Sequence, residues 1–280
     1  MRNYPWGLFP VSGMFIYSRG IFGGMSEQNT LETTETSLSV LETVVGHGPA
    51  TLSELAENTG LATSTLYTHL RTLIETEYVV RKGRRYEPGI KLFHLGELTR
   101  HRDDRYELAR RVVSDLASGV NEEVNFSIEE YGRSFVLFEE VPARTGDGYQ
   151  AGRHFHMHSS ASGKAMLAEY PEKRVREVVD RWGMPAFTDR TITDYDALLT
   201  ELETVREQGY AVSDQEELDG LQAVAVVVNS PDGSVFGTLD ISGPPYRLSE
   251  PDEVASQLRP SVESLESELR ATYPSGDHGG

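Results

Sequence analysis

The stretch TLSELAENTGLATSTLYTHLRTLIETEYVVRKGRRY, residues 51–86, decides the fold of the first part of this chain. Thr51 and Glu54 stand at the Thr-x-x-Glu spacing of a capping box, which marks the start of a helix. Gly60 predicts the end of this helix after about two turns. A second helix follows, because apolar residues recur every three or four positions at Leu66, Leu70, Leu73 and Ile74.

The segments on either side complete a small domain. An earlier helix is predicted from residue 37, and the glycine- and proline-containing segment 46–49 ends it. Its expected buried face consists of Leu38, Leu41, Val44 and Val45. Residues 78–86 predict a β-hairpin that turns near Gly83. Three short helices and a basic hairpin, with a glycine-containing turn between the second and third helices, describe a winged helix-turn-helix.

The side of the third helix opposite its apolar stripe carries groups that can bond phosphates and base edges. The hairpin adds four cations within five residues. On its own, a capped amphipathic helix usually only packs against a hydrophobic core. Five residues with four cations are, on their own, usually a solvent-exposed turn. Together, in this order, they predict binding to double-stranded DNA. The candidate contact residues are Thr63, Ser64, Thr65, Tyr67, Thr68, Arg71, Arg81, Lys82, Arg84 and Arg85.

The negative net charge of the whole chain, taken alone, argues against DNA binding. The chain has 280 residues, 44 acidic against 26 basic, and a formal net charge of -18. Only four residues are lysine, a composition that favours a halophilic source over an ordinary acidic protein. DNA contact therefore depends on the local cations of the hairpin. Cysteine is absent, which fits a reducing, cytoplasmic setting. No run reaches the ~18 apolar residues of a membrane helix.

The first 24 residues are apolar but interrupted by prolines and glycines, which fits a signal peptide poorly. Two interpretations stay open for this segment. It is a disordered tail, or translation starts at Met25. We expect residues 1–33 as an extension, 34–88 as the winged helix-turn-helix, 89–105 as a linker helix, 106–273 as a second domain and 274–280 as a tail.

The apolar stripe of the linker helix pairs with a second chain or packs on its own domain, and the sequence leaves both open. From residue 106 onward helices alternate with short strands, which makes the whole chain α+β. Pro231-Asp232-Gly233 predicts a turn that joins the last two strands as an antiparallel hairpin. The remaining strands are expected at 124–128, 134–140, 154–158 and 210–213, and helices at 106–119, 162–169, 172–182, from 195 and at the end.

The stretch HFHMHSSASGKAML, residues 154–167, suggests catalytic chemistry. Its three alternating histidines share one face of a strand about 7 Å apart, too far for all three to reach one metal ion. A phosphate loop needs Ser or Thr after Gly-Lys, and Ala165 stands there. A hydrolase using Ser159, Ser160 or Ser162 beside His158 lacks the Gly-x-Ser-x-Gly elbow. We therefore expect no metal, no cofactor and no enzyme, and a small-molecule module or hydrolase without DNA function is the alternative.

Four ordered motifs resemble the IclR family of transcriptional regulators. They are HSSASGKAMLA, TDRTITDYDALLTELETVREQGYAVSDQE, DGLQAVAVVV and LDISGPPYRL, and the helix-turn-helix stretch adds to them. The resemblance covers about residues 37–273. It implies a DNA-binding winged helix, a linker helix and a GAF-like α/β domain with an antiparallel sheet that binds a small-molecule effector. It also implies a homodimer or homotetramer that acts on a DNA operator as repressor or activator.

The resemblance further implies the effector site. Backbone amides at a helix start suit an acidic or polar ligand group. The implied positions are Ala161, Ser162, Gly163, Ser213, Asp214, Ala223, Asp240 and Ser242. Some relatives that bind small keto acids carry cysteine at the position of Ala223 and serine at that of Asp240. The extra carboxylate of Asp240 would repel a simple carboxylate, so we expect a hydroxylated ligand such as a sugar or sugar acid.

Overall fold

The computed structural model describes residues 30–141 and 151–274, and the chain divides into two units, Met1–Arg102 and Asp103–Gly280. The predicted apolar extension at residues 1–24 and almost all of the predicted tail lie outside the described residues. Each unit has its own hydrophobic core, so each is described by itself.

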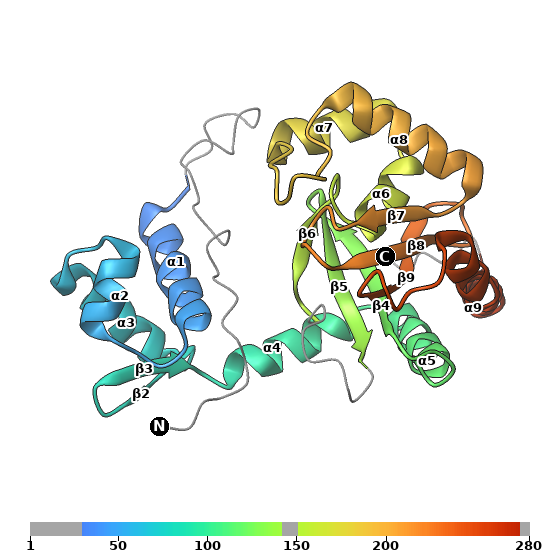
Figure 1. Ribbon diagram of the computed structural model, residues 1–280. Coiled ribbons are helices and arrows are strands. Elements are labelled where there is room, and N and C mark those ends of the chain that lie inside the picture. Colours follow the sequence, from blue (N-terminus) through green and yellow to red (C-terminus); the bar gives the residue numbers. More distant parts are fainter. Residues whose placement is uncertain (1–29, 142–150, 275–280) are drawn as a thin grey trace. The chain divides into compact units, whose positions relative to one another are not determined.

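The smaller unit consists of three helices and a three-stranded antiparallel sheet (Figure 1). Its elements are α1 (Glu32–His47), β1 (Ala50–Thr51), α2 (Leu52–Thr59), α3 (Thr63–Glu75), β2 (Val79–Lys82) and β3 (Arg85–Pro88). The predicted wing is confirmed as the β2–β3 hairpin, and β1, which periodicity did not predict, pairs with β3. Together these elements form a winged helix-turn-helix.

The predicted capping box at α2 is confirmed. The Thr51 backbone N–H donates to the Glu54 carboxylate at 2.6 Å, and the Glu54 N–H donates to the Thr51 hydroxyl at 3.3 Å. Gly60 ends the helix in the left-handed region, with φ of 66°. A side chain at this position would be strained, so Gly60 sets the turn that leads into α3.

The predicted buried face of α1 was partly wrong. Val40 and Val44 are fully buried, whereas Leu38 is 54% exposed and Val45 is 50% exposed. At 3.6 residues per turn, Leu38 and Val45 lie well around the helix from Val40 and Val44. The core of this unit covers only the side with Val40 and Val44. An apolar stripe is therefore left exposed on α1.

The predicted linker helix ends earlier than expected. The sequence pattern predicted one helix to residue 105, but α4 spans Lys91–Arg100 and α5 begins anew at Arg105 and ends at Ala117. Asp103 accepts hydrogen bonds from both the backbone N–H and the guanidinium of Arg105, at 2.7 to 3.1 Å. This local turn fixes the start of α5.

The larger unit contains a six-stranded antiparallel sheet in the order β6-β5-β4-β9-β8-β7. The strands are β4 (Glu123–Glu130), β5 (Arg133–Glu140), β6 (His154–His156), β7 (Ala211–Asp214), β8 (Gln222–Asn229) and β9 (Val235–Gly243). The predicted β8–β9 hairpin is confirmed. The strand predicted at 154–158 ends two residues earlier, because the chain turns at Met157 toward the next helix.

Helices cover both faces of this sheet (Figure 1). On one face α5 and α9 (Pro251–Thr272) bury the apolar residues of β4, β8 and β9. The other face meets α6 (Ala161–Ala168), which packs on β7, β8 and β9 and is itself covered by α8 (Tyr195–Gln208). Beside them lies α7 (Glu172–Trp182). This second core rests on small alanines of β8, so the sheet approaches α6 closely.

Candidate functional site

The outer side of α3 presents the residues that were predicted to contact DNA. All six α3 candidates are exposed, while the apolar stripe of the helix is buried. The Thr68 hydroxyl donates to the Ser64 carbonyl at 3.1 Å, and the Arg71 guanidinium pairs with Glu75 at 3.0 Å. Exposed ion pairs of this kind contribute little to stability, so Arg71 can exchange Glu75 for a phosphate.

The wing presents its four cations to solvent, but not equally. Lys82 pairs with Glu87 at 2.6 Å. Arg85 donates to the Pro49 carbonyl at 2.6 Å and lies 3.6 Å from Glu54. Arg81 donates to the Gly83 carbonyl at the turn itself. Arg84 is exposed at the tip and makes no ion pair with any described residue, so it is the cation most available to an anion.

At the start of α6 the backbone at Gly163 lies very close to the backbone at Met157. The Ser160 hydroxyl caps the helix by accepting from the Gly163 N–H at 3.1 Å. A Cβ on Gly163 would lie 2.5 Å from the Met157 backbone, so only glycine fits. The cap uses the amide of Gly163 but not those of Ala161 and Ser162. These two amides stand at the positive end of the helix dipole.

The sheet face that meets α6 carries a block of polar residues on its two central strands. Glu123, Asn125 and Ser127 of β4 pair directly across with Ser242, Asp240 and Thr238 of β9. We call these six residues the polar grid. Each of them is at most 4% exposed. Buried polar groups without partners cost free energy, which makes the polar grid the least ordinary part of this core.

Hydrogen bonds satisfy only part of the polar grid. The Asn125 amide donates to the Asp240 carboxylate at 3.0 Å and to the Ser242 hydroxyl at 3.3 Å. The Asn125 carbonyl oxygen and the hydroxyls of Ser127 and Thr238 have no partner among the described residues. The polar grid therefore offers unused hydrogen-bonding capacity in a buried part of the core.

Burial is the main reason that the pKa of Asp240 rises to about 7, from 3.8 for a free side chain. The hydrogen bond from Asn125 opposes this shift, and the charges of Glu123 and Glu139 add to it. Glu139 belongs to the same row of the sheet, because it pairs with Asn125 from the β5 side. The pKa of the Asp240 carboxyl group therefore lies near neutral pH.

The structure brings most of the predicted effector positions together. Ala161, Ser162 and Gly163 form the start of α6, while Ala223, Asp240 and Ser242 lie on the sheet face that α6 contacts. Ser213 is buried and donates to the Ser159 carbonyl at 2.9 Å. Asp214 is the exception, because its side chain is 46% exposed and pairs with Arg190. Alternation along β7 places neighbouring side chains on opposite faces.

The sequence did not single out Asn125, Ser127 or Thr238. Alternating polar residues on a strand normally indicate a solvated face. Here that face is buried, so only the packing of α6 reveals their place.

Comparison with protein-family models now decides the family. A model of the IclR helix-turn-helix domain matches residues 34–83. A model of the bacterial transcriptional regulator IclR C-terminal domain matches residues 99–267.

The chain belongs to the IclR family of transcriptional regulators. As a family member it is a DNA-binding regulator with a C-terminal effector-binding domain. The predicted fold class and regulatory function are thereby confirmed.

Named relatives agree with the family assignment. The IclR-family chain is 26% identical over 230 residues to the "Probable HTH-type transcriptional regulator ArcR" of Halobacterium salinarum, covering 79% of this chain and 86% of that protein. The crystal structure of Thermotoga maritima IclR is 27% identical, with a TM-score of 0.70, and the match covers 85% of this chain and 98% of that one. An IclR homologue from Microbacterium hydrocarbonoxydans, crystallised with 4-hydroxybenzoate, shares the fold at 23% identity and a TM-score of 0.70, over 86% of this chain and all of that one.

The histidines of the 154–167 stretch pack against other side chains in this regulator. The rings of His156 and His158 lie 5.4 Å apart and pack with Phe187. Burial lowers the pKa of His156 to about 3. Within residues 30–141 and 151–274 no group of three His, Asp or Glu side chains is placed to hold a metal ion.

The serine hydroxyls of this stretch bond to carboxylate, backbone and serine partners, and Ser159 and Ser160 also donate to the His156 backbone carbonyl. Ser159 donates to Glu217, Ser160 caps α6, and Ser162 shares a 2.9 Å hydrogen bond with Ser134. His158 bonds to the Pro185 carbonyl at 3.1 Å. In the described part of the chain, none of these serine hydroxyls is hydrogen-bonded to a histidine ring, so the geometry does not favour the hydrolase alternative.

Lys164, which follows the helix start, is almost fully buried. Its ammonium pairs with Glu216 at 2.6 Å and with Glu201 at 2.8 Å. This triad ties α6 to α8 and to the segment after β7. Lys164 therefore fastens the helix whose first turn lies over the polar grid, rather than binding a phosphate.

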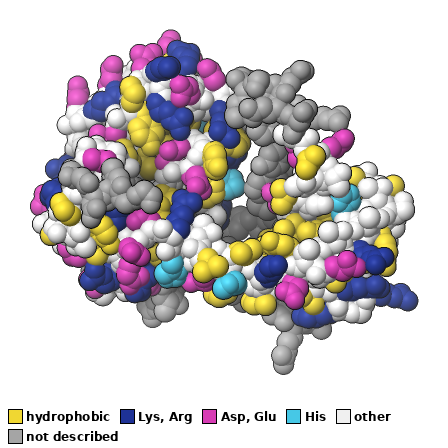
Figure 2. Space-filling view, turned by 180° about the vertical axis from the view of Figure 1, so that it is seen from behind, with side chains coloured by type: hydrophobic (Ala, Val, Ile, Leu, Met, Phe, Trp, Pro, Cys, Tyr) yellow, Lys and Arg dark blue, Asp and Glu magenta, His cyan; other side chains and the backbone are white. Residues whose placement is uncertain are grey.

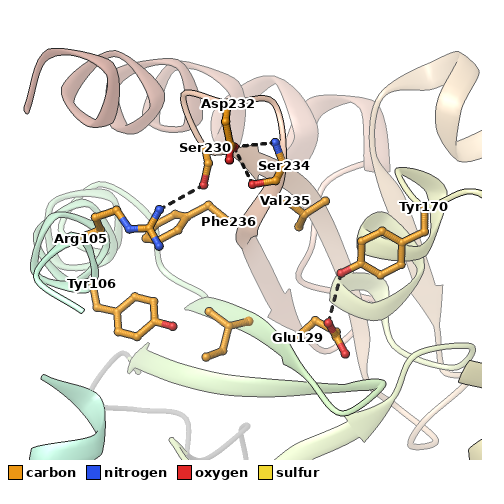
Figure 3. A pocket seen from close by; sticks show the side chains of 10 residues that line it. Arg105, Tyr106, Glu129, Tyr170, Ser230, Asp232, Ser234, Val235 and Phe236 are labelled. Carbon is orange, nitrogen blue, oxygen red and sulfur yellow. Dashed lines mark hydrogen bonds between the residues drawn. The ribbon is translucent and has the colours of Figure 1, made fainter. Parts of the chain in front are cut away.

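A separate pocket of about 280 Å³ opens near the start of α5 (Figure 3). Arg105 stacks over the Phe236 ring at 5.0 Å and donates to Ser230 at 3.4 Å, while Glu129 on the other side pairs with Arg174 at 3.3 Å. Because these charged groups already have protein partners, this pocket shows no unmet requirement for a ligand.

The surface charge agrees with the acidic composition. Acidic and basic side chains are interspersed over the face shown in Figure 2 rather than gathered into one basic field. Among the described helices, none is both long and apolar enough to span a bilayer.

Proposed function

We propose that α3 reads the base edges of a DNA operator and that the wing contacts its phosphates. The observation that carries this proposal is the exposure of all ten candidate residues on a helix and hairpin whose other sides are buried. The ten residues combine hydroxyls and a guanidinium on α3, which suit base edges, with cations on the wing, which suit phosphates.

Footprinting of the protein on genomic DNA would identify the operator and the neighbouring genes. On that operator, Thr68→Ala is expected to relax the preference at one base pair, by about 1–3 kcal/mol of discrimination. Fluorescence anisotropy with operator variants measures this. Thr200→Ala, which removes an exposed hydroxyl from α8, is the matched control. Unchanged base preference in Thr68→Ala would remove α3 from the interface.

We also propose that a small effector binds between the first turn of α6 and the polar grid. Support comes from the two amides of Ala161 and Ser162 that the cap does not use, and from three unpartnered polar atoms on the facing sheet. Organic acids, aromatic compounds and sugar derivatives are the candidate classes. A metabolite screen by thermal shift, followed by operator binding in the presence of each hit, tests the site.

The exposed apolar residues of the smaller unit support a homo-oligomer, either dimer or tetramer. Leu31, which directly precedes α1, and Leu38 and Val45 within α1 recur every seven residues, and all three are exposed. Phe93 and Leu98 are exposed on α4. A stripe of this spacing suits a partner helix, and a second copy of the chain supplies an identical stripe about a twofold axis. Leu38→Glu with Val45→Glu is expected to yield monomers in sedimentation experiments, and persistence of the oligomer would contradict this assignment.

The same function places the protein in the cytoplasm, where its DNA target lies. The acidic, lysine-poor composition and the relative in Halobacterium salinarum support a salt-rich cell. At high salt the phosphate contacts weaken, so base contacts and paired half-sites carry more of the affinity.

A further inference from the structure

One unpartnered atom of the polar grid, the side-chain carbonyl oxygen of Asn125, can only accept a hydrogen bond. Asn125 has both amide hydrogens directed at Asp240 and Ser242, which leaves its carbonyl oxygen unpartnered. The opposite orientation of this amide would place its oxygen against Asp240, which the ionised form of the Asp240 carboxyl group disfavours. Asn125 is 0% exposed, so its free oxygen is out of contact with bulk solvent.

Carboxyl groups of three neighbouring strands lie close together in this part of the sheet, and the charge of Arg153 acts on one of them, Glu139. Asp240, Glu123 and Glu139 come from three neighbouring strands, and the last two raise the pKa of the first by charge repulsion. The adjacent β8 residues, Ala223 and Ala225, are uncharged. The Lys164 ammonium of α6 is directed at Glu201 and Glu216 instead. In the described part of the chain, no lysine or arginine pairs with Asp240.

This part of the core does not suit an effector whose only charged group is a carboxylate. A carboxylate placed here would meet like charges in a low-dielectric interior, where repulsion is strong. A neutral polyol could donate hydrogen bonds to Asn125 and Asp240, but it would not compensate the negative charge of Asp240 in its ionised form. A cationic nitrogen group satisfies both the acceptors and the charge.

We propose that the effector carries an amino or guanidino group, which the Asp240 carboxylate and the Asn125 carbonyl oxygen receive inside the polar grid. The hydroxyls of Ser127 and Thr238 accept further hydrogen bonds from the same group. This inference rests on the proposed effector site and names its ligand class. It replaces the hydroxylated ligand expected from the sequence with a cationic one, because the sequence did not show that Glu123 and Glu139 lie near Asp240.

The test uses three probes of equal chain length on the full-length protein at constant ionic strength, namely 1,4-diaminobutane, 1,4-butanediol and succinate. Only the diamine is expected to raise the melting temperature. Its affinity should be about tenfold higher at pH 8 than at pH 6, because Asp240 must be ionised to receive a cation. Asp240→Asn keeps the shape, removes the charge and should abolish the shift. Asp214→Asn, on the exposed face of β7, is the matched control and should keep it.

Four outcomes would overturn the inference: a shift with the diol or succinate that depends on Asp240, a diamine shift that survives in Asp240→Asn, a diamine affinity independent of pH, or no shift with any probe. If Asp240→Asn does not melt cooperatively, Asp240→Ser replaces it under the same criteria. Operator binding is measured in the same samples. Succinate that binds through Asp240 and releases DNA would sustain the effector site and overturn only the ligand class. A failure of all probes with intact operator binding would leave the DNA-binding proposal unaffected.

Discussion

The exposed face of α3 and the polar grid are both made of hydroxyl, amide and charged side chains, yet they behave in opposite ways. On α3 these residues face solvent and can change partners freely. In the polar grid they are sealed beneath α6, and three of their atoms have no partner. The comparison teaches that polar residue type does not define a site. Burial decides whether a polar group is a tolerant contact or a constraint.

Substitution of Lys164 tests this comparison with the largest expected effect. Lys164→Met leaves Glu216 buried without its cation, and should lower the free energy of unfolding of the larger unit by about 3–5 kcal/mol. Urea denaturation followed by circular dichroism measures this. Lys173→Met removes the same charge from an exposed position on α7 and should change stability by less than about 0.5 kcal/mol. Equal changes in stability for the two variants would contradict the claim that burial makes the Lys164 ion pairs important.

The pH dependence of stability probes the buried carboxyl group of Asp240. In the folded protein Asp240 keeps its proton up to a pH of about 7, whereas the unfolded side chain releases it near 3.8. The folded state therefore binds more protons between these values, and stability falls as pH rises from about 4 to 7. The slope should reach about 1 kcal/mol per pH unit.

Asp240→Asn should reduce this slope and be more stable than the unmodified protein at pH 8. Glu217, whose pKa burial also raises to about 7, supplies part of the slope that remains. Asp214→Asn should follow the profile of the unmodified protein. Denaturation curves at four pH values give the comparison, and a slope unchanged in Asp240→Asn would contradict the prediction.

The backbone approach at Gly163 gives a smaller effect. In Gly163→Ala the new methyl group meets the Met157 backbone, so α6 must shift, at a cost of about 1–3 kcal/mol. Displacement of the first turn should also weaken any effector response. Gly96→Ala in α4 meets no atom within 4 Å and should stabilise its helix slightly. Thermal melts and effector titrations of the two variants make the test, which fails if Gly163→Ala melts and responds normally.

The wing gives the smallest effect on folding and a specific effect on DNA. Arg84→Ala should leave the melting temperature unchanged, weaken binding to all DNA sequences alike, and reduce the salt slope by about 1. Arg270→Ala, which removes an exposed arginine from α9, should leave DNA binding unchanged. Anisotropy titrations at several salt concentrations provide the slope. A sequence-dependent loss in Arg84→Ala would show that the wing reads bases.

Local signals predicted the elements of this protein well. The capping box at Thr51, the stop at Gly60 and the Pro231–Gly233 turn act within a few residues, so they are visible in the sequence and were confirmed. Two expectations were wrong for different reasons. The buried side of α1 depends on which side the rest of the core covers, which the α1 sequence does not contain. The break after α4 is local, since Asp103 bonds to Arg105, but apolar periodicity did not show it.

The sequence by itself determined the helix-turn-helix, the wing, the antiparallel hairpin and the family, because periodicity, caps and motif spacing are properties of the chain. It also directed attention to the start of α6. Only the tertiary structure decided that Asn125 and Ser127 lie opposite Asp240 and Thr238, and that α6 buries all four. Strand register and helix cover bring together residues more than a hundred positions apart. No local pattern encodes that juxtaposition, so the polar grid could be found only in the folded molecule.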